Sequence, residues 1–148
     1  MTTIAQLTTD DYEEWRTLWL AYLDFYESNL GEATTEHTFA QLLDANSAVH
    51  GVLAKNDAGE AIGLVHWVIH PATWTTTNYC YLEDLFVAPN ARSGGVGAAL
   101  IEHVHGEAKA EGSAKVYWLT AESNATARAL YDRVATRSGM IQYQIKID

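Results

Sequence analysis

Residues 79–111 read YCYLEDLFVAPNARSGGVGAALIEHVHGEAKAE, and this stretch decides the fold of the chain. Its first part, from Tyr79 to Val87, is rich in aromatic and β-branched residues, which predicts a strand that ends at the turn residues 88–90. Apolar residues then recur at helical spacing, at Val96, Ala99, Leu100, Val104 and Ala108. The stretch therefore predicts a strand, a tight glycine-rich loop and a helix with one buried face.

Glycines stand where this helix begins: Gly94, Gly95 and Gly97 follow directly after Arg92 and Ser93. The first turn of a helix has N–H groups without a partner in the helix and carries a partial positive charge, so it attracts anions. Glycines let a phosphate approach these N–H groups, and Arg92 adds a cation. The loop indicates a ligand with phosphate or pyrophosphate, while packing alone is the other explanation. GxxxxGK[ST] and GxGxxG are absent, which argues against a P-loop and a dinucleotide fold.

Length and composition predict one ordinary domain, spanning residues 1–148. Hydrophobic residues make up 48% and charged residues 19% of the chain, which is typical of a soluble globular protein, and no apolar run is long enough to span a membrane. The N-terminus lacks the features of a signal peptide, so we expect a cytoplasmic protein without a membrane partner. A net charge of -10 disfavours nucleic acid and favours a cationic small substrate, although acidity also serves solubility.

The order of the predicted elements indicates an α/β fold with a mixed, mostly antiparallel sheet flanked by helices. A compact turn at 56–59 joins two strands into a hairpin, and loops are expected at 28–35 and 71–78. The second parallel strand follows the central helix, so the two strands form a pair joined across that helix. The expected strands are 3–7, 49–55, 61–70, 79–87, 115–120 and 140–147, and the expected helices are 12–26, 36–44, 96–111 and 125–134.

The cysteine and histidine content predicts no metal site. Cys80 is the single cysteine, so it forms no intramolecular disulfide and is expected to be a small buried residue of a strand. His66 and His70 share a strand face but lie about 13 Å apart, which is too far to share a metal ion. His103 and His105 are two residues apart on a helix, so their side chains diverge.

Two adjacent carboxylates, Glu83 and Asp84, interrupt the apolar strand YLEDLFV. Their side chains point to opposite faces of the sheet unless a bulge intervenes, so at most one is expected in a given cleft. Carboxylates are costly to bury unless they are hydrogen-bonded or used, which favours a functional role for at least one. We interpret Glu83 as a general base, direct or through water, for a substrate ammonium whose pKa lies near 10.

Aromatic and polar side chains elsewhere are further candidates. Asn124 and Tyr131 lie on one face of the last helix, where Tyr131 is either a core residue or the acid that protonates a departing thiolate. Asn124 can cap that helix and also bind a pantetheine amide. Packing and contact with an amine substrate are both open for several aromatic residues, namely Tyr22, Phe25, Tyr26, Trp74, Tyr81 and Tyr143.

Several motifs together resemble those of the GCN5-related N-acetyltransferase (GNAT) superfamily. They are YLEDLFV, the RxxGxG loop RSGGVG, KVYWLT, and NATARALY in the order NxxAxxxY. The similarity covers most of the chain and is strongest from Tyr79 to Tyr131. Within the superfamily it resembles the branch that includes the spermidine/spermine N-acetyltransferases, and it also resembles histone-acetyltransferase-related proteins.

The resemblance implies a splayed central pair of parallel strands and acetyl-CoA as the cosubstrate. It implies Tyr131 as general acid, Glu83 as base, and a backbone N–H near Leu85 or Phe86 that stabilises the oxyanion. Ser93 stands where the family often has glycine, from which we expect altered affinity and no loss of binding. The implied acetyl-CoA site consists of Leu85, Phe86, Val87, Arg92, Ser93, Gly94, Gly95, Val96, Gly97, Ala98 and Asn124. The expected substrate-binding residues are Tyr22, Phe25, Tyr26, Trp74 and Asp84.

The function expected from the sequence is transfer of acetyl from acetyl-CoA to a primary amine, with a polyamine or a lysine-like small molecule favoured by the acidic charge. Acetylation of a protein lysine or N-terminus is the alternative within the enzyme class. A non-catalytic acyl-CoA-binding regulatory module is the alternative from another class, and it has no need of Glu83 or Tyr131. The resemblance also implies a homodimer formed through the final strand.

Overall fold

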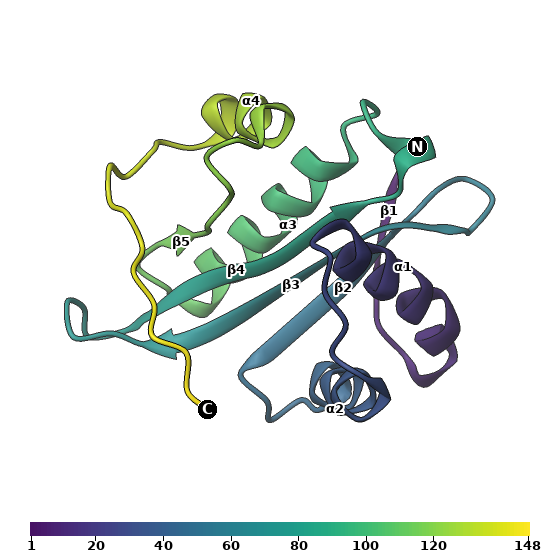
Figure 1. The fold of residues 1–148 in the computed structure, drawn as a ribbon, viewed down its shortest axis with the longest axis horizontal. Helices are drawn as coiled ribbons and strands as arrows, with labels where there is room; N and C mark the ends of the chain where they lie inside the picture. Colours follow the sequence, from purple (N-terminus) through teal and green to yellow (C-terminus); the bar gives the residue numbers. More distant parts are fainter.

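The computed structural model describes residues 1–148 as one five-stranded sheet with helices packed against it (Figure 1). The strands are β1 (Thr3–Gln6), β2 (Val49–Lys55), β3 (Ala61–Pro71), β4 (Asn78–Val87) and β5 (Val116–Tyr117). The helices are α1 (Tyr12–Phe25), α2 (Glu32–Leu43), α3 (Val96–Glu111) and α4 (Ala125–Val134), and two 3₁₀ turns span Thr9–Asp11 and Pro89–Ala91. The strands lie in the order β1-β2-β3-β4-β5, antiparallel up to β4, whereas β4 and β5 are parallel. This confirms the predicted fold class.

The sheet separates two hydrophobic cores, because successive residues of a strand point to opposite faces. On one face, which we call the α3 face, helix α3 packs on side chains such as Val65 and Cys80. On the other, the α1 face, α1 and α2 pack on side chains that include Leu53, Leu64 and Phe86. Helix α1 thus covers part of β4 and packs its aromatic residues, such as Trp19 and Tyr22, on this face of the sheet.

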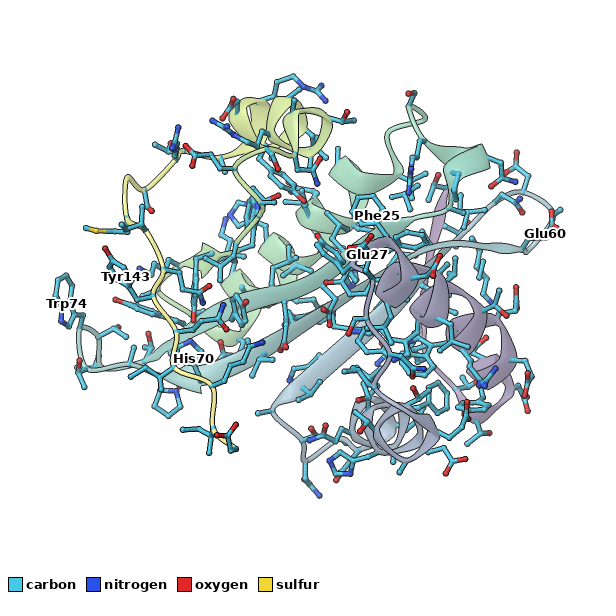
Figure 2. All side chains as sticks on the ribbon, in the orientation of Figure 1. Phe25, Glu27, Glu60, His70, Trp74 and Tyr143 are labelled. Atoms are coloured by element: carbon cyan, nitrogen blue, oxygen red, sulfur yellow. The ribbon has the colours of Figure 1, made fainter.

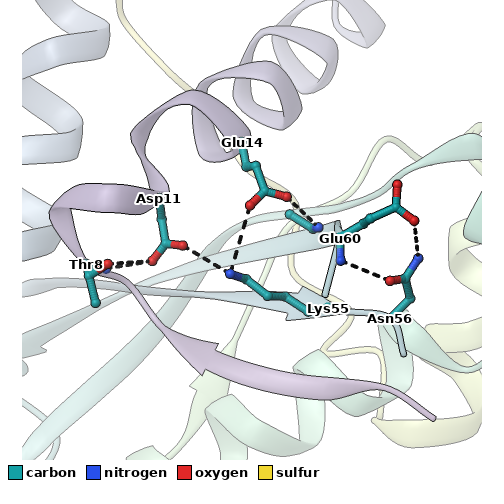
Figure 3. Close-up of polar contacts among 7 residues, drawn as sticks. Thr8, Asp11, Glu14, Lys55, Asn56 and Glu60 are labelled. Atoms are coloured by element: carbon teal, nitrogen blue, oxygen red, sulfur yellow. Dashed lines mark hydrogen bonds and ion pairs between the residues drawn. The ribbon is translucent and has the colours of Figure 1, made fainter. Parts of the chain in front are cut away.

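A network of charged side chains ties the start of α1 to the β2–β3 hairpin (Figure 3). The Asp11 carboxylate accepts the Thr8 N–H at 2.8 Å and the Lys55 ammonium at 3.1 Å. The neighbouring Glu14 accepts the Ala61 N–H at 2.9 Å. Burial alone would raise the pKa of Asp11, but the hydrogen bonds from Thr8 and Lys55 hold it below its ordinary value. The network therefore fixes the position of α1 over the sheet.

Helix α2 begins at Glu32, whereas the sequence predicted a loop up to residue 35. Gly31 is the residue before the helix, with φ of +80°, and its carbonyl accepts the N–H of Thr35 at 3.2 Å. Thr35 is buried and faces the core. A glycine that can adopt positive φ was sufficient to start the helix earlier than the polar composition indicated.

Strand β5 is much shorter than the predicted 115–120. It pairs with β4 only through Val116 and Tyr117, opposite Cys80 and Tyr81. A bulge lies two residues further along β4, and a bulge bends its strand away from a straight neighbour. Residues 118–120 therefore continue without a ladder, which produces the splay implied by the resemblance.

The predicted final strand at 140–147 is wrong for this chain. Residues 135–148 form neither helix nor strand, and the segment runs as an extended tail (Figure 1). A strand needs a partner for its N–H and C=O groups, and the segment pairs with none of the five strands. Its large apolar side chains are 77% to 91% exposed, namely Met140, Ile141, Tyr143, Ile145 and Ile147.

Candidate active site

A β-bulge in β4 decides where the two adjacent carboxylates point. Asp84 lies opposite His66, but Leu82 lies opposite Trp67, the next residue of β3, so Glu83 is the extra residue between them. Tyr81 and Asp84 then both lie on the α1 face, with Glu83 between them. The sequence analysis expected opposite faces unless a bulge intervened, and the bulge is present.

Asp84 is turned inward and is held by two neighbours. Its Oδ1 accepts the Tyr22 hydroxyl at 2.7 Å, and its Oδ2 lies 2.9 Å from Nδ1 of His66. Both Asp84 and Tyr22 were predicted to contact the substrate. The structure brings them together, with Asp84 mostly buried behind the Tyr22 hydroxyl.

Glu83, in contrast, is exposed on the same side of the sheet. Its pKa is raised, first by partial desolvation and then by the neighbouring Asp84 carboxylate. Burial and the Glu83 charge also raise the pKa of Tyr81, and burial, Asp84 and Glu83 all raise the pKa of Tyr22. The Glu83 carboxylate is therefore near enough to both tyrosines for its charge to affect their pKa values.

The C-terminal end of α1 adds an aromatic wall beside these carboxylates. The rings of Tyr22 and Tyr26 are 5.2 Å apart, and those of Phe25 and Tyr26 are 5.1 Å apart, each pair edge to face. Phe25 and Tyr26 are 55% and 51% exposed, so half of each ring faces open space. All three predicted aromatic contacts on α1 therefore gather near β4.

Tyr131 approaches this wall from α4. Its ring packs edge to face on Trp118, with centroids 5.5 Å apart. Its pKa is raised by burial first and then by the nearby Tyr26, so its hydroxyl keeps its proton well above neutral pH. Tyr131 thus packs at the edge of the α3-face core and lies near enough to Tyr26 for the charge of one hydroxyl to affect the other.

The glycine-rich loop leaves three backbone N–H groups free at the start of α3. Gly95 has φ of +81° and Ser93 has φ of +71°, a conformation that glycine adopts without strain and serine does not. The N–H groups of Val96, Gly97 and Ala98 donate to no acceptor in the protein, and the first intrahelical bond is from Ala99 to the Gly95 carbonyl. Three free N–H groups at the positive end of a long helix can bind a phosphate.

Gly97 is required for packing. A Cβ at this position would lie 3.1 Å from Cδ2 of Leu130 on α4, a tighter contact than side chains ordinarily make. The close approach lets α4 lie against the start of α3, which brings Tyr131 and the loop into one region. Gly97 therefore combines a packing role with one of the free N–H groups at the start of α3.

Arg92 and Asn124 flank this region with side chains that are only partly used. The Arg92 Nε donates to the carbonyl of Val87 at 3.0 Å, and its guanidinium lies 5.6 Å from the centre of the Phe86 ring. Asn124 caps α4, because its Oδ1 accepts the N–H of Ala127 at 3.2 Å. The predicted cap is thereby confirmed, and the Asn124 amide NH₂ donates to no protein group.

The edge of β4 that faces β5 has no strand partner beyond Tyr81. Leu85, Phe86 and Val87 pair on their other side with β3, through Val65, Leu64 and Gly63. The N–H and C=O groups on the side that faces away from β3 are therefore free. An extended ligand with amide groups can bind them through the same kind of hydrogen bonds that join two strands.

Two candidate substrate contacts, Trp74 and Tyr143, lie outside this region. Figure 2 shows Trp74 at the tip of the β3–β4 loop, far from Phe25, and Trp74 is 90% exposed. Tyr143 lies on the exposed tail. Cys80 is buried as predicted, and burial followed by the charge of Glu111 raises the pKa of its thiol to about 11. No three His, Cys, Asp or Glu side chains are grouped to hold a metal ion, and no helix is both long and apolar enough to cross a bilayer.

A model of the acetyltransferase (GNAT) family matches residues 5–135. The chain belongs to this family. The D-amino-acid N-acetyltransferase HPA3 of Saccharomyces cerevisiae (strain ATCC 204508 / S288c) is 35% identical over 135 residues, which are 90% of this chain and 84% of that protein. The protein is thus an acetyl-CoA-dependent N-acetyltransferase, as the sequence motifs predicted.

Solved structures share the fold of this acetyltransferase. AAC(6')-Iy, in complex with the bisubstrate analog CoA-S-monomethyl-acetylneamine, has a TM-score of 0.86 at 20% identity, covering 100% of this chain and 99% of the other. The ribosomal-protein-alanine N-acetyltransferase of Brucella melitensis biovar Abortus 2308 has a TM-score of 0.83 at 21% identity, covering 99% and 100%. At this identity the likeness establishes the fold.

Sequence reasoning about the acetyltransferase missed two residues behind the site, His66 and Trp15. His66 was considered only as a metal ligand, and Trp15 was not among the candidate residues. In the structure the Trp15 indole N–H donates to Nε2 of His66 at 3.0 Å. The signal for this pair was a histidine within an apolar strand run, but the partner of that histidine depends on the β3–β4 register, which local patterns do not define.

Proposed function

We propose that the protein transfers acetyl from acetyl-CoA to the primary amine of a small molecule by direct attack. One observation carries the proposal: the bulge in β4 turns the Glu83 carboxylate to the open α1 face, beside Tyr22, in the region that Tyr131 enters from α4. A raised pKa makes Glu83 a stronger base, and a raised pKa keeps Tyr131 protonated until a thiolate forms.

In the proposed reaction, Glu83 takes a proton from the acceptor ammonium, directly or through water. The free amine attacks the thioester carbonyl, and the C–N bond forms. A backbone N–H near Leu85 or Phe86 stabilises the oxyanion, an effect commonly worth about 3 kcal/mol. The attacking nitrogen loses its second proton to solvent. When the intermediate collapses, the C–S bond breaks and Tyr131 donates its proton to the departing CoA thiolate. The amide and free CoA are released, Glu83 gives its proton to solvent, and the tyrosinate regains a proton from solvent, so that one proton is released per turnover.

The proposed acetyl-CoA site follows from the free donors already described. The pyrophosphate binds the N–H groups of Val96, Gly97 and Ala98, with Arg92 beside them. The pantetheine amides bind the unpaired edge of β4, and the Asn124 NH₂ donates to one of their carbonyls. Ser93 presents its N–H in a strained left-handed conformation, for which we propose altered affinity relative to a glycine.

For the acceptor we propose a polyamine or a lysine-like small molecule. Support comes from the net charge of -10 and from two carboxylates on one face of the site, which attract a cation. The aromatic rings of Tyr22, Phe25 and Tyr26 can also contact an ammonium favourably. Free D-amino acids are the second candidate, because the yeast relative carries that activity in its name.

The experiment is a panel of acceptors assayed for release of free CoA thiol, with the acetylated product identified by mass spectrometry. The panel contains diamines, polyamines, lysine analogues, D- and L-amino acids and basic peptides. Turnover with polyamines and lysine analogues supports the favoured class, and turnover with D-amino acids alone replaces it by the second candidate. Turnover with peptides alone replaces both by protein acetylation.

Calorimetry separates the enzyme from the non-catalytic alternative. If acetyl-CoA binds tightly and no member of the panel releases CoA thiol, an acyl-CoA-binding regulatory module becomes the better description. The exposed Glu83 and the protonated Tyr131 favour the enzyme, because a binding module needs neither group.

We further propose a homodimer formed through the C-terminal tail. The tail alternates apolar side chains that are almost fully exposed, and a cavity of about 400 Å³ lies between α3, β5 and the end of α4, lined in part by Ile101, Trp118 and Val134. A second copy can insert its tail there. Light scattering should report a dimer for the wild type and a monomer for Ile145→Lys. Gln144→Lys, on the alternate side of the tail, should leave the dimer intact. A monomeric wild type would contradict the proposed dimer.

We also propose that the protein is cytoplasmic. The chain keeps Cys80 as a free thiol and has no second cysteine, as is usual in a reducing compartment. Fractionation of cells with an antibody against the protein tests the location directly, and recovery outside the cytoplasm would refute it.

A further inference from the structure

Behind the proposed active site, four side chains from α1, β3 and β4 form one continuous series of hydrogen bonds. Trp15 donates to Nε2 of His66 at 3.0 Å, and Nδ1 of His66 lies 2.9 Å from Oδ2 of Asp84. The Tyr22 hydroxyl completes the series at 2.7 Å from Oδ1 of Asp84. Trp15 and His66 are 0% and 2% exposed, so water does not compete for these bonds.

The chemistry of the donors fixes where the protons lie. An indole N–H can only donate, so Nε2 of His66 must accept and carries no proton. The imidazole is therefore the neutral tautomer with its proton on Nδ1, which it donates to Asp84. Asp84 thus receives two hydrogen bonds and no cation. A mostly buried carboxylate stabilised in this way keeps its negative charge close to Glu83.

The same contacts hold the bulge in place. His66 and Asp84 are directly opposite each other on β3 and β4, on the side of the bulge that follows Glu83. Their bond joins the two strands through side chains at the point where the ladder changes register. If this bond were lost, Asp84 would have no buried partner on β3, and the extra residue could shift along β4.

We propose that Asp84 and His66 are positioning residues for acetyl transfer, which hold the bulge that presents Glu83 and fix the Tyr22 hydroxyl as an acceptor for the substrate amine. This inference rests on the proposed role of Glu83 as the base. The Tyr22 hydroxyl donates its hydrogen bond to Asp84. Its oxygen can therefore only accept a hydrogen bond from a ligand, which favours ligands with N–H donors. Asp84 acts through Glu83 and Tyr22 and does not contact the substrate.

The charge of Asp84 also affects the strength of the base. The ionisable groups that face Glu83 are Asp84 and Tyr81 on β4, His66 on β3 and Tyr22 on α1. Of these, the Asp84 carboxylate raises the pKa of Glu83, while burial raises the pKa of both tyrosines and keeps them uncharged. Removing that charge should make Glu83 a weaker base that loses its proton at lower pH.

The test compares Asp84→Asn and Tyr22→Phe with the matched control Tyr12→Phe, which removes a hydroxyl from the same helix without removing a hydrogen bond of the series. We expect Asp84→Asn to lower kcat at least 10-fold, to leave the KM for acetyl-CoA within about twofold, and to move the acid limb of the kcat/KM profile to lower pH. We expect Tyr22→Phe to lower kcat/KM for the amine by about 10-fold, and Tyr12→Phe to have no effect.

Two outcomes would overturn the inference. A folded Asp84→Asn variant with unchanged kcat and an unmoved acid limb, even if it is less stable in urea, shows a merely structural role. If Asp84→Asn does not fold, Tyr22→Phe decides, and unchanged kinetics for the amine contradict the proposal. The variant Glu83→Gln separates this failure from a failure of the proposed function. If Glu83→Gln keeps full activity, Glu83 is not the base. If Glu83→Gln loses activity while Asp84→Asn and Tyr22→Phe keep wild-type kinetics, only the positioning roles of Asp84 and Tyr22 are refuted.

Discussion

Replacing Gly95 by alanine tests the glycine-rich loop through a single methyl group. Gly95 has φ of +81°, and no atom lies within 4 Å of the position that a Cβ would occupy. The substitution therefore adds backbone strain without a clash. An L-residue in this conformation costs roughly 1–2 kcal/mol, partly offset by about 0.4–1 kcal/mol because alanine restricts the unfolded chain.

The expected net loss of stability is about 1 kcal/mol, which lowers Tm by about 2–4 °C in a chain of this size. The loop can relieve the strain by turning its N–H groups away from the ligand. If the full 1 kcal/mol appears in binding, the Kd for acetyl-CoA rises about fivefold. Urea unfolding followed by tryptophan fluorescence measures the first effect, and titration calorimetry with acetyl-CoA measures the second.

Two other glycines supply the controls. Gly59 has φ of +80° and open space around it, but it lies in the β2–β3 turn, so Gly59→Ala should lose the same stability and keep the wild-type Kd. Gly106 lies inside α3 with open space around it, so Gly106→Ala should gain about 0.8–1 kcal/mol from helix propensity. If Gly95→Ala and Gly59→Ala have the same Kd for acetyl-CoA, the loop is not the phosphate site.

Three further substitutions or reagents test the fold around the site. Asp11→Asn should reduce the free energy of unfolding by roughly 1–2 kcal/mol at pH 7, because the hydrogen bond from the Lys55 ammonium is weaker to an amide than to a carboxylate. The pKa of Asp11 is lowered in the folded protein, so this contribution is fully present above its ordinary pKa near 4 and is lost progressively as pH falls below it. Urea unfolding should therefore show a difference that shrinks as pH falls below about 4, and a difference independent of pH there would contradict the role of the charge. Cys80, with a thiol pKa of about 11 and no exposure, should react with a disulfide reagent at pH 8 only after urea unfolding, and rapid labelling of the native protein would show that β4 opens. Gly51→Ala should reduce the free energy of unfolding by about 1–3 kcal/mol, because the new Cβ would lie 2.9 Å from both the His66 ring and Leu42. If urea unfolding gives the wild-type stability, the packing around Gly51 is looser than in the structure.

Much of the fold could be predicted because local patterns and global packing agree. The apolar run of β3, the turn at Gly59 and the helical spacing in α3 each select one structure, and the structure confirms all three. The final strand was predicted from its alternation, yet residues 140–147 pair with none of the five strands. Strand periodicity alone does not reveal whether a segment pairs with a sheet edge.

The candidate site was only partly predictable for a related reason. The loop at Gly95 and the cap at Asn124 are local, and the sequence was sufficient to find them. The contact between His66 and Asp84 joins positions 18 residues apart and depends on the register across a bulge. The sequence could state that a bulge would bring Glu83 and Asp84 to one face, but the bulge itself is set by packing on both faces of β4.

The most direct test of the central claim compares the rate of CoA release by wild type, Glu83→Gln and Tyr131→Phe, with the best acceptor of the panel at saturating acetyl-CoA. Each substitution keeps the shape of the side chain and removes one proton-transfer group. We predict that kcat falls by about 100-fold or more in each variant while both bind acetyl-CoA as the wild type does. If both variants release CoA at the wild-type rate, Glu83 and Tyr131 are not the base and acid of this acetyltransferase.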